Sequence, residues 1–596
     1  MRRGIKDVKA KFADAETLDS FDLEVQTGGY SYDHRPPPDL EEPEEPERKA
    51  ASFPLNDVGN GHRIVTYFGD ELLHVPRVGW FVWDGRQWAK DPDELQVRSL
   101  GQTLAARIEA EIPFVALEDW QRDLLAAIPG LKQSIAEIDA IDAKARTQEQ
   151  SEERLKLISR LNLAEKQRDA LSDKRSAHRS FAKTSGNSDR IKKAQGEAGV
   201  MLSRSLDELD ADALAVNVAN GVLRFSVTRM DGAGRVADMR LEPHSREALQ
   251  TKLINADYDP DAEAPLFHEF LERVQPDQVM RDFLQRWFGL CMTGITGEQK
   301  LAFLYGHGAN GKSVLVDTIW GLMGDYAATA KIESLTGQTK RGGADATPDL
   351  IPLMGARAVR ASEPEQGERL KEGTIKELTG GEPILVRQLH ADFVEVKPEF
   401  KLTISGNYKP EIRGTDDGIW RRLLLVPFDV QIPPAERDPD LGRKLALEAP
   451  GILKWMADGL FDYLESGLQE PDRVLEATKE YRADSDPVGT FLTECTTVTG
   501  DADDFMLSRD LIDAFNFWNI QREGTEWGGR TISNHLKGKS SHWRHPATGQ
   551  CFAPAKRKAT GYRGIKLTDT FKHDFDQRPH GRGYQTSKAR EEEPDL

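Results

Sequence analysis

The stretch from Leu304 to Trp320, LYGHGANGKSVLVDTIW, decides the fold of the middle of this chain. An apolar, strand-like run precedes a glycine-rich segment that ends in Gly-Lys-Ser, and a helix-like apolar pattern follows. This is the Walker A form, Gly-x4-Gly-Lys-Ser, between a strand and a helix. Its glycines let backbone N–H groups turn toward phosphates, and the helix N-terminus favours the anion. We therefore expect a nucleoside triphosphate site here.

The spacing of the loop gives its residues separate tasks. Lys312 is expected to place its charge on the terminal phosphates, and Ser313 to offer its hydroxyl to a magnesium ion. ATP and Mg²⁺ are therefore the predicted cofactors. The candidate ATP contacts are Gly306, Gly308, Asn310, Gly311, Lys312, Ser313 and Val314.

A second strand-like run, 355–365, ends in carboxylates. We expect Glu363 to polarise the attacking water and, with Ser313, to serve the metal, whereas Glu365 is the weaker option. Ser362 stands where an aspartate usually precedes this glutamate, so direct carboxylate ligation of the metal is an open point. Taken alone, Glu363 is as well explained as a surface side chain.

Polar residues also follow the third strand-like run and precede the fourth. Run 400–407, FKLTISGN, ends in Asn407, which we expect between the first two strands, bonded to the γ-phosphate or the water; a turn residue is the alternative. Arg421 and Arg422 lie ahead of an apolar strand in GTDDGIWRRLLLVPF. They form a solvated edge or an ion pair, or in a ring ATPase one reaches a neighbour's γ-phosphate as an arginine finger.

In this order the motifs resemble the superfamily three helicases. The closer resemblance is to the helicase half of phage and plasmid primase–helicases, the group that includes the poxvirus primase–helicase. The resemblance implies an AAA+-type P-loop core that forms a hexameric ring on single-stranded DNA. It matches Lys312 and Ser313 to Walker A, Glu363 to Walker B and Asn407 to the sensor asparagine. One residue of the arginine pair matches the finger.

The resemblance also implies DNA contacts inside the ring. The stretch 378–398, LTGGEPILVRQLHADFVEVKP, is expected to form a hairpin that projects into the channel, with Arg387 and His390 near its tip. Lys376 is a further basic candidate on the preceding helix. A full primase–helicase also carries an N-terminal polymerase-type domain, for which we expect no room before the β-rich segment, so no primase activity is expected in this chain.

A second basic region lies near the C-terminus. Between Arg530 and Leu567 the chain has nine lysines and arginines and no aspartate or glutamate. A helix at RTISNHLKGK followed by a basic hairpin around AKRKATG is the outline of a winged helix. A merely soluble basic module and a partner-protein contact are the alternatives. The candidate DNA contacts are Lys537, Lys539, Lys556, Arg557, Lys558 and Arg563.

Composition sets the remaining limits. The net charge of −19 argues against a chain that coats nucleic acid over its whole surface, but not against a local basic site. Because no apolar run approaches ~20 residues and no targeting signal is evident, we expect a cytoplasmic protein without a membrane partner. The three cysteines have no paired metal spacing.

The predicted fold is multidomain α/β, with an AAA+-type P-loop ATPase core, a helical N-terminal region and a C-terminal winged-helix-like domain. Three tryptophans between 80 and 88 mark a small β-meander; they are read as core, with a base-stacking platform as the alternative. The predicted segments are a disordered acidic tail (1–55), a β-rich segment (56–100), a helical or coiled-coil region (101–204), a family-type helical domain (205–298), the ATPase core (299–480), the winged-helix-like domain (481–575) and a polar tail (576–596).

We therefore expect an ATP-dependent replicative DNA helicase of phage, prophage or plasmid type. Its expected partners are single-stranded and forked DNA and further copies of itself, with a separate primase or polymerase as another candidate. A non-translocating DNA-binding initiator or packaging-type ATPase is the alternative. A small-molecule phosphotransferase fits less well, because it has no use for the hairpin stretch or the arginine pair.

Overall fold

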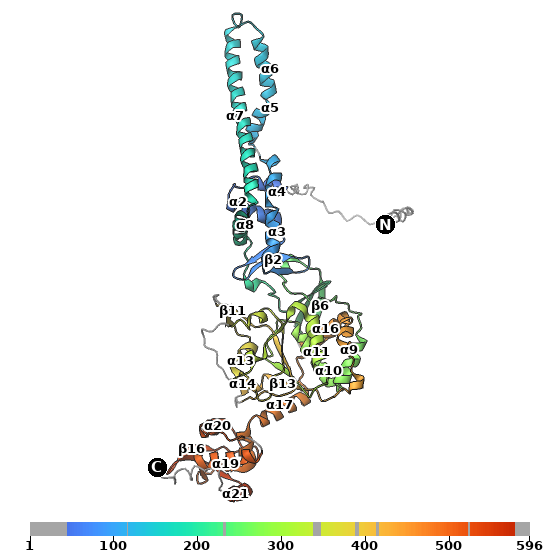
Figure 1. Ribbon diagram of the computed structural model, residues 1–596, viewed down its shortest axis with the longest axis vertical. Coiled ribbons are helices and arrows are strands. Elements are labelled where there is room, and N and C mark those ends of the chain that lie inside the picture. Colours follow the sequence, from blue (N-terminus) through green and yellow to red (C-terminus); the bar gives the residue numbers. More distant parts are fainter. Residues whose placement is uncertain are drawn as a thin grey trace, which may run out of the picture. The chain divides into compact units, whose positions relative to one another are not determined.

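The computed structural model describes residues 45–115, 117–230, 234–337, 347–387, 393–412, 417–522 and 525–578. The chain divides into two compact units (Figure 1). One consists of Met1–Ser52 and Ala110–Leu171, and the other of Phe53–Glu109 and Ser172–Leu596. No helix in the described ranges is long and apolar enough to cross a bilayer.

The described part of the first unit is largely an antiparallel helical hairpin. Polar contacts hold its two arms together: Gln121 Nε2 donates to Gln167 Oε1 at 2.7 Å, and Lys132 pairs with Glu165 at 3.1 Å. Its helices are α5 (Asp119–Ala126), α6 (Ile128–Asp139) and the N-terminal part of α7 (Gln148–Ser185).

The second unit begins with helices around the predicted β-meander. Trp80 and Trp88 are each 4 % exposed and belong to the core, whereas Trp83 is half-buried. Residues 57–68, which we expected inside the β-rich segment, instead form a helix: Asn56 caps Gly59 N–H, and Ile64 and Phe68 lie one turn apart on the buried face. The elements are α2 (Asp57–Phe68), β1 (Leu72–Val75), β2 (Gly79–Trp83), β3 (Trp88–Asp91), α3 (Leu95–Gln102), α4 (Leu104–Ala110) and α8 (Ser188–Met201).

The expected helical domain at 205–298 contains an antiparallel sheet as well as helices, which corrects that prediction. Its first part is an antiparallel sheet in the order β4-β5-β6. The turn between β4 and β5 consists of Ala219 and Asn220, because Val218 pairs with Gly221. Its elements are β4 (Ala215–Val218), β5 (Gly221–Met230), β6 (Gly234–Glu242), α9 (Pro265–Val274) and α10 (Gln278–Cys291).

A five-stranded parallel sheet in the order β13-β7-β12-β9-β8 forms the centre of the chain. Ala302 and Leu304 of β7 pack against one hydrophobic cluster with α10, α11 and α16, whereas Leu301 and Phe303 face a second cluster with α13. Burial on both faces explains why these strands read as continuous apolar runs. The elements are β7 (Leu301–Tyr305), α11 (Lys312–Met323), β8 (Ala327–Thr329), β9 (Ala358–Ser362), α13 (Glu372–Gly380), β12 (Lys401–Gly406), β13 (Leu423–Pro427) and α16 (Ala449–Ser466).

The C-terminal part has a hydrophobic cluster of its own, which includes Phe491, Phe515, Leu536 and Phe552. The expected helix and basic hairpin are both present, and the hairpin belongs to a sheet in the order β15-β17-β16. The principal elements are α18 (Pro487–Cys495), β15 (Phe505–Leu507), α19 (Ser508–Gln521), α20 (Gly529–His542), β16 (Ala553–Lys556), β17 (Thr560–Arg563) and α21 (Asp569–Asp576).

Candidate functional site

The predicted hydrolysis residues meet at the carboxyl edge of the parallel sheet. Gly306 follows β7, Glu363 follows β9 and Asn407 follows β12. Strand β12 pairs with both β7 and β9, so Asn407 comes from the strand between the other two, as the sequence predicted. Ligand sites of open parallel sheets lie at this edge.

Lys312 lies at the centre of this arrangement and is buried, at 5 % exposure. Its Nζ donates to the carbonyl of Gly306 at 2.6 Å, to Asn310 Oδ1 at 3.2 Å and to Asn407 Oδ1 at 3.2 Å. Burial lowers the pKa of Lys312, and the nearby charge of Glu363 acts in the opposite direction. Within the described ranges, Lys312 has neutral oxygen acceptors but no carboxylate in ion-pair contact.

Two glycines of the loop are fixed by close packing, and a third borders open space. A Cβ atom on Gly306 would lie 2.2 Å from the Phe428 carbonyl oxygen, and one on Gly311, whose φ is +83°, would lie 2.4 Å from Val274 Cγ1. A Cβ atom on Gly308 would meet nothing within 4 Å. The loop is therefore held at both ends and open in its middle, which fits a phosphate chain.

Asn310 organises the loop through its side chain, a role that the sequence did not reveal. It is 3 % exposed, and its Nδ2 donates to the carbonyls of His307 at 2.7 Å and Phe428 at 3.1 Å. Its Oδ1 accepts from Lys312 Nζ. Because this amide is occupied within the protein, only the backbone of Asn310 remains for the predicted ATP contact.

Ser313 and Val314 occupy the first turn of α11, where the N–H groups have no carbonyl partner inside the helix. Ser313 is exposed, so its hydroxyl is accessible beside the glycine loop. These donors, the Lys312 ammonium and the open loop are chemically suited to a triphosphate with a magnesium ion.

Glu363 is exposed at the end of β9 and has a left-handed backbone, with φ of +56°. Its N–H donates to the Ser405 carbonyl at 2.7 Å, which ties the turn to β12. A non-glycine residue held in this region stores strain, and such residues cluster at functional sites. Its charge acts on the pKa of Lys312, which indicates that the two side chains belong to one electrostatic site.

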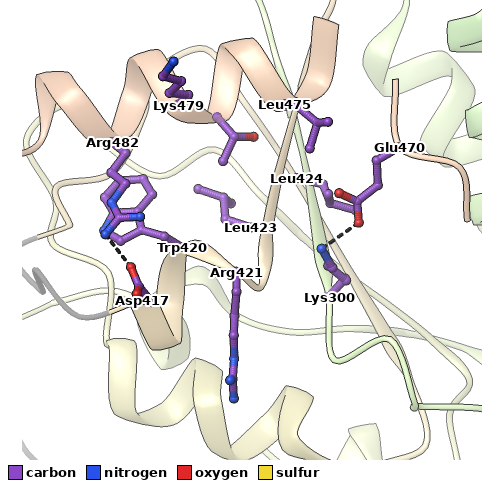
Figure 2. A pocket seen from close by; sticks show the side chains of 11 residues that line it. Lys300, Asp417, Trp420, Arg421, Leu423, Leu424, Glu470, Leu475, Lys479 and Arg482 are labelled. Atoms are coloured by element: carbon purple, nitrogen blue, oxygen red, sulfur yellow. Dashed lines mark hydrogen bonds and ion pairs between the residues drawn. The ribbon is translucent and has the colours of Figure 1, made fainter. Parts of the chain in front are cut away.

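The arginine pair is divided by burial. Arg422 is 7 % exposed, its Nη1 donates to the Gly418 carbonyl at 2.7 Å and its Nε to Thr379 Oγ1 at 3.2 Å. Arg421 is exposed and borders a pocket of about 330 Å³. Figure 2 shows its side chain directed away from the Asp417–Arg482 ion pair, whose atoms are 2.6 Å apart. Arg421 is therefore the exposed member of the predicted pair, and Arg422 is the buried one.

The predicted hairpin is present, formed by β10 (Ile384–Val386) and β11 (Val394–Val396) in antiparallel register. Arg387 directly follows β10, and its guanidinium lies 4.9 Å from the centre of the Phe393 ring. Lys376 lies half-buried on α13. His390 lies outside the described residues.

Within the C-terminal basic region the cations are not equivalent. Lys539 is 4 % exposed and pairs with Asp486, so the expectation that it contacts DNA is wrong: it faces the domain core from the buried side of α20. Arg557 is partly occupied, because its Nη2 donates to the Ala502 carbonyl at 2.8 Å. Exposed cations whose side chains have no hydrogen bond or ion pair to described residues are Arg530, Lys537, Lys556, Lys558 and Arg563.

Lys409 is a residue near this site that sequence reasoning missed. Its ammonium lies 4.9 Å from the ring centre of Tyr305 and 5.3 Å from that of Tyr481. Tyr305 directly precedes the glycine loop, and Lys409 follows Asn407 by two residues. The sequence could have indicated this residue, because Lys409 lies close to the end of the strand that leads to Asn407.

Comparison with known proteins adds two family matches. Residues 61–276 match a family described as "D5 N terminal like". Residues 304–422 match a "Family of unknown function", and this range contains the glycine loop, Glu363, Asn407 and both arginines.

Curated relatives come from large DNA viruses and a virophage. "Putative helicase L207/L206" of Acanthamoeba polyphaga mimivirus is 30 % identical over 240 residues, which is 37 % of this chain and 25 % of that protein. "Putative helicase 022R" of Frog virus 3 is 29 % identical over 269 residues, 42 % of this chain and 27 % of that protein. The resemblance to the phage and viral primase–helicase family is confirmed. The chain spans about a quarter of the length of these two relatives.

A solved structure titled as the A form apo structure of the NrS-1 C-terminal region is 11 % identical to this chain. The match covers 57 % of this chain and 96 % of that one, with a TM-score of 0.31. A score at this level does not establish a shared fold.

Proposed function

We propose that this chain is an ATP-dependent replicative DNA helicase of phage, prophage or plasmid type, which acts as a ring on single-stranded DNA. The observation that carries the proposal is Lys312, a buried ammonium that neutral oxygens from the glycine loop and Asn407 surround. A buried cation without an opposite charge is costly, so the arrangement favours a site that receives an anion.

The residues of the sheet edge divide the hydrolysis reaction between them. Lys312 binds the terminal phosphates, the first-turn N–H groups of α11 orient them, and the Ser313 hydroxyl holds the metal. The magnesium ion, when bound, supplies charge that neutralises the phosphates. Asn407 positions the attacking water, and the Glu363 carboxylate accepts its proton.

Arg421 is the candidate for completing the site of a neighbouring subunit. Its guanidinium is exposed and has no ion pair within the described ranges, whereas Arg422 is buried and hydrogen-bonded within its own subunit. We propose an AAA+-type P-loop core, which the parallel sheet and its glycine loop support, and two such subunits side by side in a ring, where the arginine of one reaches the phosphate of the other. We take the ring to be a hexamer.

The β10–β11 hairpin is the candidate for moving DNA. It follows Glu363 in the chain and precedes β12 and Asn407, so hydrolysis residues flank it on both sides. We propose that Arg387 and His390 contact the phosphates of a single strand in the channel, with Lys376 as a further contact. Movement of the residues at the sheet edge then moves the hairpin and the single DNA strand that it contacts.

The C-terminal part is proposed to be a winged-helix-like DNA-binding domain. Helix α20 is followed by the β16–β17 hairpin, which carries Lys556, Arg557 and Lys558 at its tip. Single-stranded and forked DNA and further copies of this chain are the proposed partners, with a separate primase or polymerase as another candidate. Cytoplasmic localisation stays a prediction.

Unwinding of a forked DNA, measured beside ATP hydrolysis with and without single-stranded DNA, tests the proposal. We expect hydrolysis to rise with single-stranded DNA and the fork to open. The double variant Arg387→Ala/His390→Ala should keep hydrolysis and lose unwinding. ATP turnover without unwinding by the unmodified chain would instead favour a non-translocating initiator or packaging-type ATPase.

A further inference from the structure

Lys409 is a half-buried cation beside the hydrolysis residues, and the proposed function gives it no task. Its ammonium lies 4.9 Å from the ring centre of Tyr305 and 5.3 Å from that of Tyr481. Within the described ranges this ammonium has neither a carboxylate in ion-pair contact nor a hydrogen-bond acceptor. A cation over aromatic rings is held less strongly than one that donates to a phosphate. The charge of Lys409 therefore remains available to an anion.

Lys409 is connected to the same two strand ends that hold Lys312. Tyr305, whose ring lies below the Lys409 ammonium, directly precedes Gly306, and the Gly306 carbonyl accepts from Lys312 Nζ at 2.6 Å. Asn407, two residues before Lys409, accepts from the same Nζ at 3.2 Å. Strands β7 and β12, which carry these residues at their ends, are paired in parallel. The second ammonium thus belongs to the same edge of the sheet as the first.

The order of the strands indicates which part of the site Lys409 approaches. Strand β12 lies between β7, which leads to the glycine loop, and β9, which leads to Glu363. The Lys409 ammonium contacts Tyr305 of β7, and it forms no ion pair with Glu363. It is therefore directed toward the strand of the phosphate loop and not toward the strand of the carboxylate.

The backbone that carries Lys409 is fixed, whereas its side chain is long enough to move. Tyr481 lies on α17 (Asp472–Asp484), is 4 % exposed, and donates its hydroxyl to the carbonyl of Pro410, the next residue after Lys409. Burial raises the pKa of Tyr481, so its hydroxyl stays protonated and remains a donor. The flexible four-carbon stem of a lysine lets the ammonium leave the rings while the backbone keeps its place.

We propose that Lys409 is a second cation for the terminal phosphate of the nucleotide that Lys312 binds, and that its ammonium moves from the two tyrosine rings to this phosphate. This inference rests on the proposed function and deepens it. ADP lacks the terminal phosphate, so Lys409 contributes to the binding of a nucleoside triphosphate and not to that of a diphosphate. The chain then recognises ATP through a cation of its own, besides the arginine proposed to come from a neighbour.

Equilibrium binding of ADP and of a non-hydrolysable ATP analogue to the full chain, with Mg²⁺ and without DNA, tests the inference. Lys409→Met removes the charge and keeps an unbranched side chain that can fill the space between the rings. We expect the affinity for the ATP analogue to fall about tenfold, because a charge-assisted contact to the terminal phosphate is lost. The affinity for ADP should stay within about twofold, which also shows that the variant is folded.

Lys331→Met is the matched control. Lys331 is exposed and follows β8, the edge strand of the same sheet, by two residues. Its affinities for both nucleotides should stay within about twofold of those of the unmodified chain. Lys409→Arg keeps the charge and should retain the preference for the ATP analogue over ADP within about threefold.

Three results would overturn the inference: unchanged binding of the ATP analogue by Lys409→Met, an equal loss for both nucleotides, or a loss of preference in Lys409→Arg as large as in Lys409→Met. An equal loss would mean that Lys409 only supports the fold of the loop after β12. Failure of the proposed function shows separately, as absence of hydrolysis stimulated by single-stranded DNA in the unmodified chain.

Discussion

The glycine-loop site and the C-terminal basic domain both use cations, but they hold them in opposite ways. At the loop, one ammonium is buried among neutral oxygens, and Gly306 and Gly311 have no space for a side chain. In the basic domain, many lysine and arginine side chains are exposed, and a few form ion pairs with carboxylates. The fixed spacing of the glycine loop identifies each of its site residues from the sequence. For the basic domain, composition identifies only the region in which the cations lie.

Lys312→Ala is expected to have the largest effect, because it affects the glycine-loop site and leaves the basic domain intact. The variant removes the only charge at the centre of the phosphate loop, so we expect ATP hydrolysis to fall by at least about 10³-fold. Duplex binding by the C-terminal part should remain within about twofold of the unmodified chain. Steady-state hydrolysis and DNA-binding assays measure both effects, with Lys331→Ala as an exposed-lysine control. Loss of both ATP hydrolysis and DNA binding would mean that the variant is misfolded or that the two sites are wrongly assigned.

The arginine pair separates a catalytic cation from a structural one. We expect Arg421→Ala to lower kcat by about 10³-fold with an unchanged melting temperature, because the proposed function assigns its exposed guanidinium to a neighbour's phosphate. Arg422→Ala leaves the Thr379 hydroxyl and the Gly418 carbonyl without their buried partner and should destabilise the fold by about 2 kcal/mol. The kcat and the melting temperature are measured for both variants. A destabilised Arg421→Ala together with an Arg422→Ala that loses only kcat would refute this assignment of roles.

Lys539→Ala tests the correction within the basic domain. Its removal leaves Asp486 without its ion-pair partner, and we expect destabilisation by about 2 kcal/mol, since Asp486 is still partly exposed. Lys537→Ala, two residues away and exposed, should leave stability within about 0.5 kcal/mol. Denaturation of both variants decides the matter. Equal stability of the two would mean that Lys539 is not part of the domain core.

A second buried ammonium, Lys401 at the start of β12, predicts a smaller effect of pH on stability. Burial lowers its pKa from 10.5 to about 7, with Cys291, Arg357 and Glu399 as its charged or titratable neighbours. Above pH 7 the unfolded chain binds more protons at this residue than the folded chain, so stability should rise with pH, by at most about 1.4 kcal/mol per unit.

Denaturation between pH 7 and 8.5 measures this slope, and Lys401→Met supplies the control because it removes the titrating group. The window ends there because burial raises the pKa of Cys291 to about 12, which contributes the opposite sign once free thiols ionise. An identical slope in Lys401→Met would assign the pH dependence to other groups.

Sequence patterns determined the elements whose residues interact locally. The glycine loop, the strands that end at Glu363 and Asn407, the hairpin and the basic helix each have a pattern a few residues long, and each was found where expected. Residues 57–68 are the exception: alternating apolar residues were read together with the strands that follow, although an Asn56 cap and one-turn spacing make them a helix. At such a boundary between a helix and a strand, the spacing of the apolar residues and the capping residue must be considered together.

Only the tertiary structure decided the fate of individual polar side chains. Arg421 and Arg422 are adjacent in sequence, and Lys537 and Lys539 are two apart, yet one of each pair is buried and bonded while the other is exposed. The partners that bury them are distant in the chain: Thr379 for Arg422 and Asp486 for Lys539. Burial depends on which segments pack together, and a short sequence pattern contains no information about such contacts.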